Sequence, residues 1–497
     1  MKFTILFGGK AGQGSNVLST ILGSALIKKG YYVFVSRDYQ SIIRGGHNFN
    51  VLTFSDAPIY SNNSEIDLII SLDESTISLH KKELKKGGNI ISGEGKGNMY
   101  FAGRLFKMLC LDFKVLEEEF KELGKNFAEN MKEAKEGYDE EKKTACKIVS
   151  NKSKLTFSNG NRGISKGAIK SGLDVYFAYP MTPATNVISE LAEKQIENNL
   201  IVLELESEIA VINAAIGSAI TGAKTMIGTS GGGFDLMTES LSLTGVAEVP
   251  LVIYLASRPG PSTGVATYTG QGDLDLARHS GHGEFPRMVL APGNPEEAEE
   301  LTSQAFYFTQ KFGIPAIILS DKHLAESFYT SDKTPVIISS KKSTLLKRYN
   351  SYETDEFGCA TENAERIKRN VEERLKKGRE IEKEAEKFKQ FNIYGNKNSK
   401  NVVVSFGSTK GAILDAIKDL DVKFIQILHI EPFPSKVKKE IEGKNIVLVE
   451  NSATGQLGKV IAEKTGIIIP ENSRILRYDG RPFLHDELNK EIRGKLK

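Results

Sequence analysis

The sequence has only three cysteines among its 497 residues, and Cys110, Cys146 and Cys359 lie far apart in the chain. This number and spacing exclude a disulfide framework and a Cys-x-x-Cys pair. They also fall short of the four thiolates that usually hold a [4Fe–4S] cluster. We therefore do not expect this chain to carry an iron–sulfur cluster.

Long apolar runs and an excess of one charge are also missing. No segment reaches the roughly 18 apolar residues needed to span a bilayer. The opening MKFTILFGGKAGQGS has too short an apolar run for a signal peptide. The 66 Lys and Arg residues nearly balance 63 Asp and Glu residues, for a net charge of +3, so no basic field demands nucleic acid. We expect a cytoplasmic protein that binds neither nucleic acid nor membranes.

The order of strand-like and helix-like segments predicts an α/β protein with three α/β units. Residues 1–150 begin with a strand, a glycine loop and an amphipathic helix, which favours a doubly wound sheet. A second unit with six apolar strand segments covers residues 156–340. The segment 341–399 is a charged helical connector, and residues 400–497 form the third unit.

The stretch FAYPMTPATNVISE, residues 177–190, ends a predicted strand at two prolines. Pro180 cannot continue a central strand, and Pro183 suits the first position of a helix. Thr182 would then be the N-cap of that helix. Free amides and the helix dipole at the carboxyl end of a strand favour an anion at this place.

Two further charged features follow predicted strands. Glu204, Glu206 and Glu208 alternate, so in an extended strand they would share one face. They are either a solvated strand edge or individually partnered carboxylates. Arg258 follows the apolar segment VPLVIYLA, residues 249–256, and is either an ion-pair partner or a clamp for an anion.

The loop GGKAGQG and the segment RGGHN place glycines beside a cation in the first unit. Gly12, Gly14, Arg44 and Gly45 could therefore accept a phosphate, although a tight structural turn explains the same pattern. His279 and His282 lack an accompanying carboxylate motif, so we assign no metal to them.

Many ordered motifs resemble one family. They are YPMTPAT, ESEIAVINAAIGSAITGAK, TSGGGFDLMTE, SRPGPSTG, GQGDL, GHGEFPR, FGSTKG, VENSATGQLGKV and YDGRPF. Together they resemble the alpha subunit of 2-oxoacid:ferredoxin oxidoreductases, and residues 1–150 resemble the gamma subunit, fused ahead of alpha. The resemblance implies a Rossmann-like gamma domain, a thiamine-diphosphate-binding-type domain on the pyrimidine side, and a C-terminal domain like that of transketolase.

The resemblance also implies roles for single residues. The glutamate that bonds N1′ of the thiamine aminopyrimidine, and so favours the imino tautomer that takes up a proton, matches Glu208. The threonine and arginine that contact the oxoacid match Thr182 and Arg258. The remaining positions are Tyr179 and Pro180 on the pyrimidine side, Thr267 and Tyr268 beside the substrate, and Gly12, Gly14, Arg44 and Gly45 on the coenzyme A side.

Two parts of the family's active site are missing from the sequence. No Gly-Asp-Gly motif with a paired-Asn segment for the diphosphate is present, and neither are the cluster cysteines. The resemblance assigns both, with Mg²⁺ and the [4Fe–4S] cluster, to a separate beta subunit in an alpha-beta or (alpha-beta)2 assembly. Thiamine diphosphate would be shared between the subunits, coenzyme A would be a co-substrate, and ferredoxin would accept the electrons. The alternatives are a thiamine-dependent ligase or decarboxylase that does not use ferredoxin, and a non-catalytic nucleotide-binding scaffold.

The sequence departs from the family in the loop after Arg258. Tyr268 and Gly270 stand where oxoglutarate-type members commonly carry a basic residue and a glutamate, and Gly232 stands where the family often has proline. A second carboxylate buried without a cation would cost several kcal/mol. We therefore predict that monocarboxylic 2-oxoacids are turned over at least as well as 2-oxoglutarate.

Overall fold

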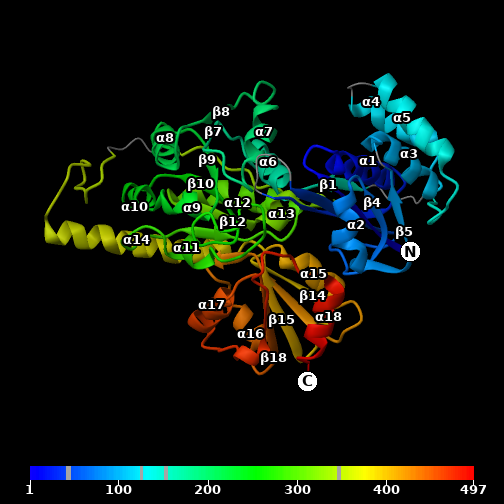
Figure 1. Cartoon of the computed structure of the whole chain (residues 1–497). Coiled ribbons are helices and arrows are strands. Elements are labelled where there is room, and N and C mark those ends of the chain that lie inside the picture. The colour runs from blue at the N-terminus through cyan, green and yellow to red at the C-terminus, as the bar shows by residue number, and fades with distance from the viewer. Residues whose placement is uncertain (41–45, 94, 124–126, 150–154, 344–348, 497) are drawn as a thin grey trace. The chain divides into compact units, whose positions relative to one another are not determined.

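A computed structural model describes residues 1–40, 46–93, 95–123, 127–149, 155–343 and 349–496. The chain divides into two compact units. Unit 1 comprises Met1–Ser158, Glu326–Lys333 and Leu484–Lys490, and unit 2 comprises Asn159–Ala325, Thr334–Phe483 and Glu491–Lys497. The described strands form three sheets (Figure 1). None of the described helices is long and apolar enough to cross a membrane.

The sheet of unit 1 is mixed, so the prediction of a doubly wound sheet is wrong for this unit. β3 lies between β1 and β2 and is antiparallel to both, with Lys2 opposite Ser55 and Tyr32 opposite Ser55. β1 and β4 are parallel. The order is β5 (Leu84–Ser92), β4 (Ile66–Ser71), β1 (Lys2–Lys10), β3 (His47–Ser55), β2 (Tyr32–Asp38), β13 (Phe328–Ser331) and β6 (Thr156–Ser158).

The core of unit 1 forms between this sheet and its helices. Leu18, Leu22 and Leu26 recur at helical spacing along α1 and are buried with Phe101 and Leu105 of α3. The helices of unit 1 are α1 (Ser15–Lys28), α2 (Glu74–His80), α3 (Asn98–Met108), α4 (Phe113–Leu123) and α5 (Phe127–Glu140), with a 3₁₀ turn at Lys81–Glu83. Helix α18 (His485–Arg493) begins in this unit and ends in unit 2.

Unit 2 contains a largely parallel sheet to which the second group of apolar segments contributes six strands. Every residue of β10 is buried, because alternate side chains enter separate cores on the two faces of the sheet. Ile253 and Leu255 belong to one core, and Val252 and Tyr254 belong to the other. The order is β17 (His429–Glu431), β11 (Met288–Leu290), β12 (Pro315–Asp321), β10 (Leu251–Ser257), β9 (Thr225–Thr229), β7 (Val175–Ala178) and β8 (Ile201–Glu204), with β17 antiparallel to β11.

The sequence sets the ends of α12 (Pro295–Phe312) clearly. Asn294 accepts a hydrogen bond from the Glu297 amide at 2.9 Å, Pro295 is the first helical residue, and Gly313 ends the helix with φ 62°. The other helices around this sheet are α6 (Gly160–Lys170), α7 (Asn186–Ala192), α8 (Glu208–Ile220), α9 (Gly231–Asp235), α10 (Thr238–Ala247), α11 (Leu274–His279) and α13 (Lys322–Glu326).

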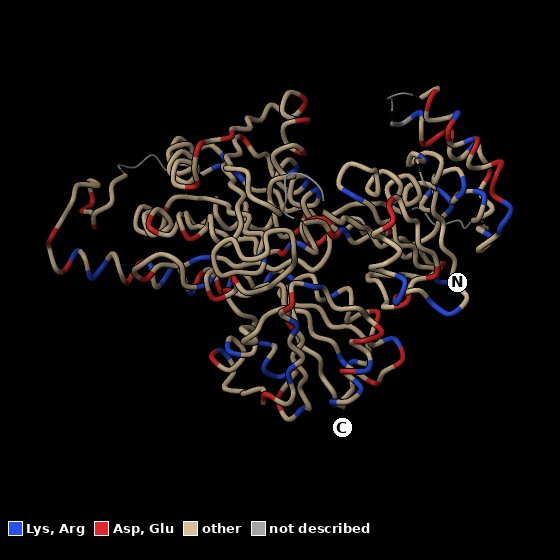
Figure 2. Tube along the Cα trace, viewed as in Figure 1, with Lys and Arg blue, Asp and Glu red and all other residues tan. Residues whose placement is uncertain are grey.

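The third sheet also lies in unit 2 and starts earlier than residue 400, because β14 (Phe391–Gly395) pairs with β16 as an edge strand. The order is β14, β16 (Lys423–Ile427), β15 (Asn401–Phe406), β18 (Asn445–Glu450) and β19 (Arg474–Leu476). Its helices are α15 (Thr409–Ala416), α16 (Val437–Ile441) and α17 (Gln456–Thr465), with a 3₁₀ turn at Glu471–Ser473. The charged connector contains α14 (Ala364–Ala385), along which basic and acidic residues are interspersed (Figure 2).

Buried His429 predicts how acid destabilises unit 2. Its Nε2 lies 3.0 Å from Gln304 Oε1, and burial lowers its pKa from 6.5 to about 3. The unfolded chain binds the proton more readily than the folded chain between these values, so stability falls as pH drops below 6.5, by ~1.4 kcal/mol per pH unit. Between about pH 7.5 and about pH 5, His429→Gln should therefore gain about 2 kcal/mol relative to wild type. Thermal melting of both chains across this range measures the difference, and a difference that does not change with pH would contradict the prediction.

Candidate active site

Three loops meet at one edge of the parallel sheet of unit 2. β7, β9 and β10 are neighbours and parallel, with Ala178 opposite Gly228 and Leu255 opposite Thr229. Their carboxyl ends therefore lie at the same edge, which is where open α/β sheets bind ligands. The loops that follow these strands carry Thr182, the glycines of α9, and Arg258.

Thr182 lies at this edge, but it is not a helix N-cap, so that prediction is wrong. Residues 182–185 form a turn in which the Ala184 amide donates to Met181 O at 2.9 Å. Helix α7 begins only at Asn186, after Thr185. The Thr182–Pro183 peptide bond is cis. The Thr182 carbonyl instead accepts a hydrogen bond from Arg258 Nη1 at 3.0 Å, while Tyr179 and Pro180 are exposed.

Glu208 is separated from the two glutamates that precede it. β8 ends at Glu204, and Ser207 caps α8 by accepting a hydrogen bond from the Ala210 amide at 3.3 Å. Glu208 is the first residue of α8 and is 4% exposed, whereas Glu204 and Glu206 are exposed. The prediction that the three share one strand face is wrong, because the chain leaves the strand after Glu204.

The Glu208 carboxylate lies against the glycine helix α9. A Cβ atom on Gly233 would lie 2.7 Å from Glu208 Oε1 and 2.3 Å from Thr229 Oγ1, so only glycine fits here. Within the described residues, no side chain or amide makes a hydrogen bond or ion pair with this carboxylate. Because a buried carboxylate needs a donor, the site suits a ligand that presents a hydrogen-bond donor to Glu208.

Arg258 and Asp273 form the charged part of the site. Burial lowers the pKa of Arg258, and the Asp273 carboxylate opposes this shift. Arg258 Nε is buried and has no hydrogen-bond partner among the described residues, so it is available to an anion. Burial raises the pKa of Asp273, which lies close to Gly231. Asp273 was not predicted as a site residue, although the motif GQGDL places it directly before α11.

The loop after Arg258 folds back on Pro259. The Val265 amide donates to Pro259 O at 3.1 Å, and Thr267 is buried. The half-buried Tyr268 is covered by Arg481, whose guanidinium carbon lies 3.9 Å from the centre of the tyrosine ring. Arg481 was not predicted as a site residue, although it belongs to the quoted motif YDGRPF. A cation therefore does lie beside Tyr268, and it comes from a distant part of the chain.

Unit 1 contains the second group of predicted residues. Gly12 and Gly14 have φ of 89° and 93°, which glycine adopts freely. Arg44 and Gly45 lie outside the described residues. Nearby in sequence, His47 Nε2 lies 2.8 Å from His80 Nε2, and a Cβ atom on Gly8 would lie 3.1 Å from the His47 ring. Burial, and then His80, lower the pKa of His47. No sequence pattern predicted this histidine pair.

Two family models match the chain. Residues 166–392 match "Pyruvate flavodoxin/ferredoxin oxidoreductase, thiamine diP-bdg", and residues 4–131 match "Pyruvate ferredoxin/flavodoxin oxidoreductase". The structure is similar to that of a 2-oxoglutarate:ferredoxin oxidoreductase from Magnetococcus marinus, with a TM-score of 0.88, 22% identity and 100% of both chains covered. This likeness confirms the predicted α/β fold class.

Curated relatives match over nearly the whole sequence. A 2-oxoacid:ferredoxin oxidoreductase subunit alpha from Saccharolobus solfataricus is 29% identical, with 99% of this chain and 98% of the relative covered. The 2-oxoglutarate synthase subunit KorA of Methanocaldococcus jannaschii is 28% identical over 69% of this chain and 100% of its own length. The matched models and these relatives agree with the resemblance found in the sequence. The chain belongs to the family of 2-oxoacid:ferredoxin oxidoreductase alpha subunits.

Proposed function

We propose that this chain binds the pyrimidine side of thiamine diphosphate and the carboxylate of a 2-oxoacid. With coenzyme A, the complete enzyme converts the oxoacid to an acyl-CoA and carbon dioxide and passes the electrons to ferredoxin. The observation that carries the proposal is the buried Glu208 carboxylate, which has no partner among the described residues and lies at the same sheet edge as Arg258.

Glu208 fits the pyrimidine of thiamine. A carboxylate that bonds N1′ favours the tautomer whose exocyclic nitrogen can take up a proton. The absence of a Cβ at residue 233 leaves room for the Glu208 carboxylate, because a Cβ there would lie 2.7 Å from Glu208 Oε1. Thiamine diphosphate, when bound, supplies the nucleophilic carbon and the electron sink that decarboxylation requires.

Arg258 fits the carboxylate of the oxoacid. Its Nη1 is held by the Thr182 carbonyl at 3.0 Å, which orients the guanidinium, and its buried Nε remains free among the described residues. A guanidinium held in this way can fix a carboxylate and so position the adjacent keto group. Thr182 thus orients Arg258 through its main-chain carbonyl.

The rest of the active site requires a partner. Three cysteines cannot supply four thiolates, so the cluster is assigned to a beta subunit. The sequence also lacks the Gly-Asp-Gly motif for the diphosphate, so Mg²⁺ and the diphosphate contacts are assigned to the same subunit. Gly12 and Gly14 of unit 1, with Arg44 and Gly45, remain the predicted coenzyme A side. In this proposal the alpha and gamma parts act together with beta in an alpha-beta or (alpha-beta)2 assembly.

Arg481 changes the expectation for the substrate. The sequence favoured monocarboxylic oxoacids because the loop after Arg258 contains no cation. Arg481 brings a guanidinium to Tyr268 from elsewhere in unit 2, and it is exposed rather than paired with a carboxylate among the described residues. We therefore propose that Arg481 receives the distal carboxylate of a dicarboxylic oxoacid such as 2-oxoglutarate.

Glu208→Gln tests the catalytic assignment. The amide keeps the shape of the side chain but removes the negative charge, so turnover by the complex with the beta subunit should fall roughly 10²–10⁴-fold. Thiamine diphosphate should still bind. Oxoacid-dependent ferredoxin reduction and cofactor content measure the two effects. The exposed Glu206→Gln serves as the matched control, and full activity of Glu208→Gln would remove the glutamate from the mechanism.

Two adjacent glycines test the geometry of the site. Gly233→Ala places a methyl group within 2.7 Å of Glu208 Oε1, whereas a Cβ atom on Gly232 has only Ser262 O near it, at 3.9 Å. We expect Gly233→Ala to lose at least about tenfold in kcat/KM, which is ~1.4 kcal/mol of transition-state stabilisation, and Gly232→Ala to stay near wild type. Equal activities would show that the carboxylate does not depend on this contact.

Arg481→Gln tests the substrate assignment. The kcat/KM for 2-oxoglutarate should fall about tenfold more than that for pyruvate, because only the dicarboxylate presents a second charge. Arg481→Lys, which keeps the charge, should restore part of the preference. If both substrates lose activity equally, Arg481 supports the loop and does not select the substrate.

A further inference from the structure

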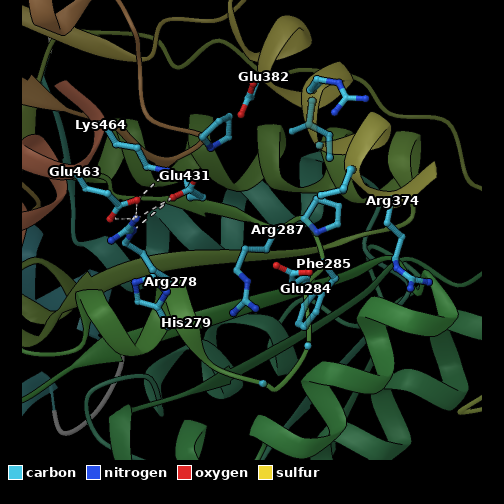
Figure 3. A pocket seen from close by; sticks show the side chains of 18 residues that line it. Arg278, His279, Glu284, Phe285, Arg287, Arg374, Glu382, Glu431, Glu463 and Lys464 are labelled. Carbon is cyan, nitrogen blue, oxygen red and sulfur yellow. Dashed lines mark hydrogen bonds and ion pairs between the residues drawn. The ribbon is translucent and has the colours of Figure 1, made fainter. Parts of the chain in front are cut away.

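A cavity lies in unit 2, with a volume of about 540 Å³, inside the range of small-molecule sites. Three segments line it, namely residues 278–287 after α11, helix α14, and the region of β17 and α17 (Figure 3). Thr182, Glu208 and Arg258 are not among the residues that line it. The cavity is therefore distinct from the candidate active site.

Part of the charge in this cavity is already neutralised. The buried Arg278 pairs with Glu463 at 2.8 Å and with Glu431 at 3.4 Å. Lys464 lies 3.2 Å from each of the same two glutamates. These two cations and two carboxylates compensate one another, and Figure 3 shows them gathered on one wall.

Arg287 is different because it is a buried cation without a counter-ion. It is 8% exposed, and its Nη1 donates to Ser280 O at 2.6 Å and to Ser280 Oγ at 3.2 Å. Its guanidinium carbon lies 4.4 Å from the centre of the Phe285 ring. No carboxylate in the described residues forms an ion pair with it. Burial lowers its pKa to about 10, with Glu431 opposing the shift, so the charge persists at neutral pH.

Such a charge is costly to bury unless an anion compensates it. The Nη1 edge of the guanidinium is occupied by Ser280, which leaves Nε and Nη2 as a pair of donors that matches a carboxylate. The side chains beside it are apolar, with Phe285, Pro286 and Ile381 in the lining. A ligand with a carboxylate and a small apolar body therefore fits the cavity.

The other lining acids restrict the charge of this ligand. Glu284 and Glu382 also line the cavity, and both are exposed. The lining also contains Arg374, which pairs with Glu353, and the exposed Arg379. Arg379 and the two glutamates together leave one net negative charge in this part of the lining, which would repel the additional negative charges of a diphosphate or a nucleotide. We propose that this cavity is a binding site for a small monocarboxylate, separate from the active site, and that Arg287 pairs with its carboxylate.

Butyrate is a suitable probe, because it has no keto group for the active-site chemistry. The intact chain, purified with its partner subunit, should bind butyrate saturably in a ligand-observed NMR titration, with a Kd of about 1 mM or lower. Arg287→Gln should weaken binding at least tenfold, and Arg287→Lys, which keeps the charge but loses the paired donors, should weaken it less. Oxoacid turnover without butyrate should not change in either variant, which shows that they fold.

Two controls locate the site. Lys376→Gln on α14 removes an exposed cation that does not line the cavity, and it should leave butyrate binding unchanged. Arg258→Gln should also leave it unchanged, because Arg258 lies in the active site. Loss of binding in Arg258→Gln with retention in Arg287→Gln would overturn the proposal, as would the absence of saturable binding. Stronger competition by diphosphate than by acetate would overturn the choice of a monocarboxylate.

Discussion

The parallel hydrogen bonding of β7, β9 and β10 is the constraint on which the site in unit 2 depends. Parallel pairing brings the carboxyl ends of these strands to one edge. Arg258 then lies near enough to donate to the Thr182 carbonyl at 3.0 Å, although 76 residues separate them. A shift of one residue in any of the three strands would reverse its side chains between the two cores. The cores on both faces therefore hold the loops of the candidate site in place.

Glycine gives this edge its specific shape. At residue 233 the missing Cβ lets Glu208 approach α9, and at residue 231 it does the same for Asp273. Two carboxylates thereby enter a region where water is largely excluded, and burial raises the pKa of Asp273. Two charged groups of the site, the Glu208 carboxylate and Arg258 Nε, have no hydrogen-bond partner among the described residues. This arrangement is suited to a cofactor that donates a hydrogen bond to the carboxylate and to an anionic substrate that accepts one from the guanidinium.

Unit 2 contains two buried arginines with different surroundings. Arg278 is compensated by Glu431 and Glu463, as is usual for a structural ion pair, whereas Arg287 has only Ser280 as a hydrogen-bond partner among the described residues. Arg278 lies in α11, and Arg287 lies in the segment that follows this helix. Asp273, at the candidate active site, is the N-cap of the same helix, so α11 connects that site to the cavity at Arg287.

The sequence by itself determined the α/β class, the apolar strands of unit 2 and the family, because apolar periodicity and short motifs are local properties. It also singled out Glu208, Thr182 and Arg258. The mixed sheet of unit 1, the end of β8 at Glu204 and the start of α7 at Asn186 were decided by strand pairing and turn hydrogen bonds, which local patterns do not specify. Asp273 and Arg481 joined the site only through tertiary contacts. Arg481 is more than 200 residues from Tyr268 in the chain. Only the packing of the loops brings its guanidinium carbon to 3.9 Å from the centre of the tyrosine ring.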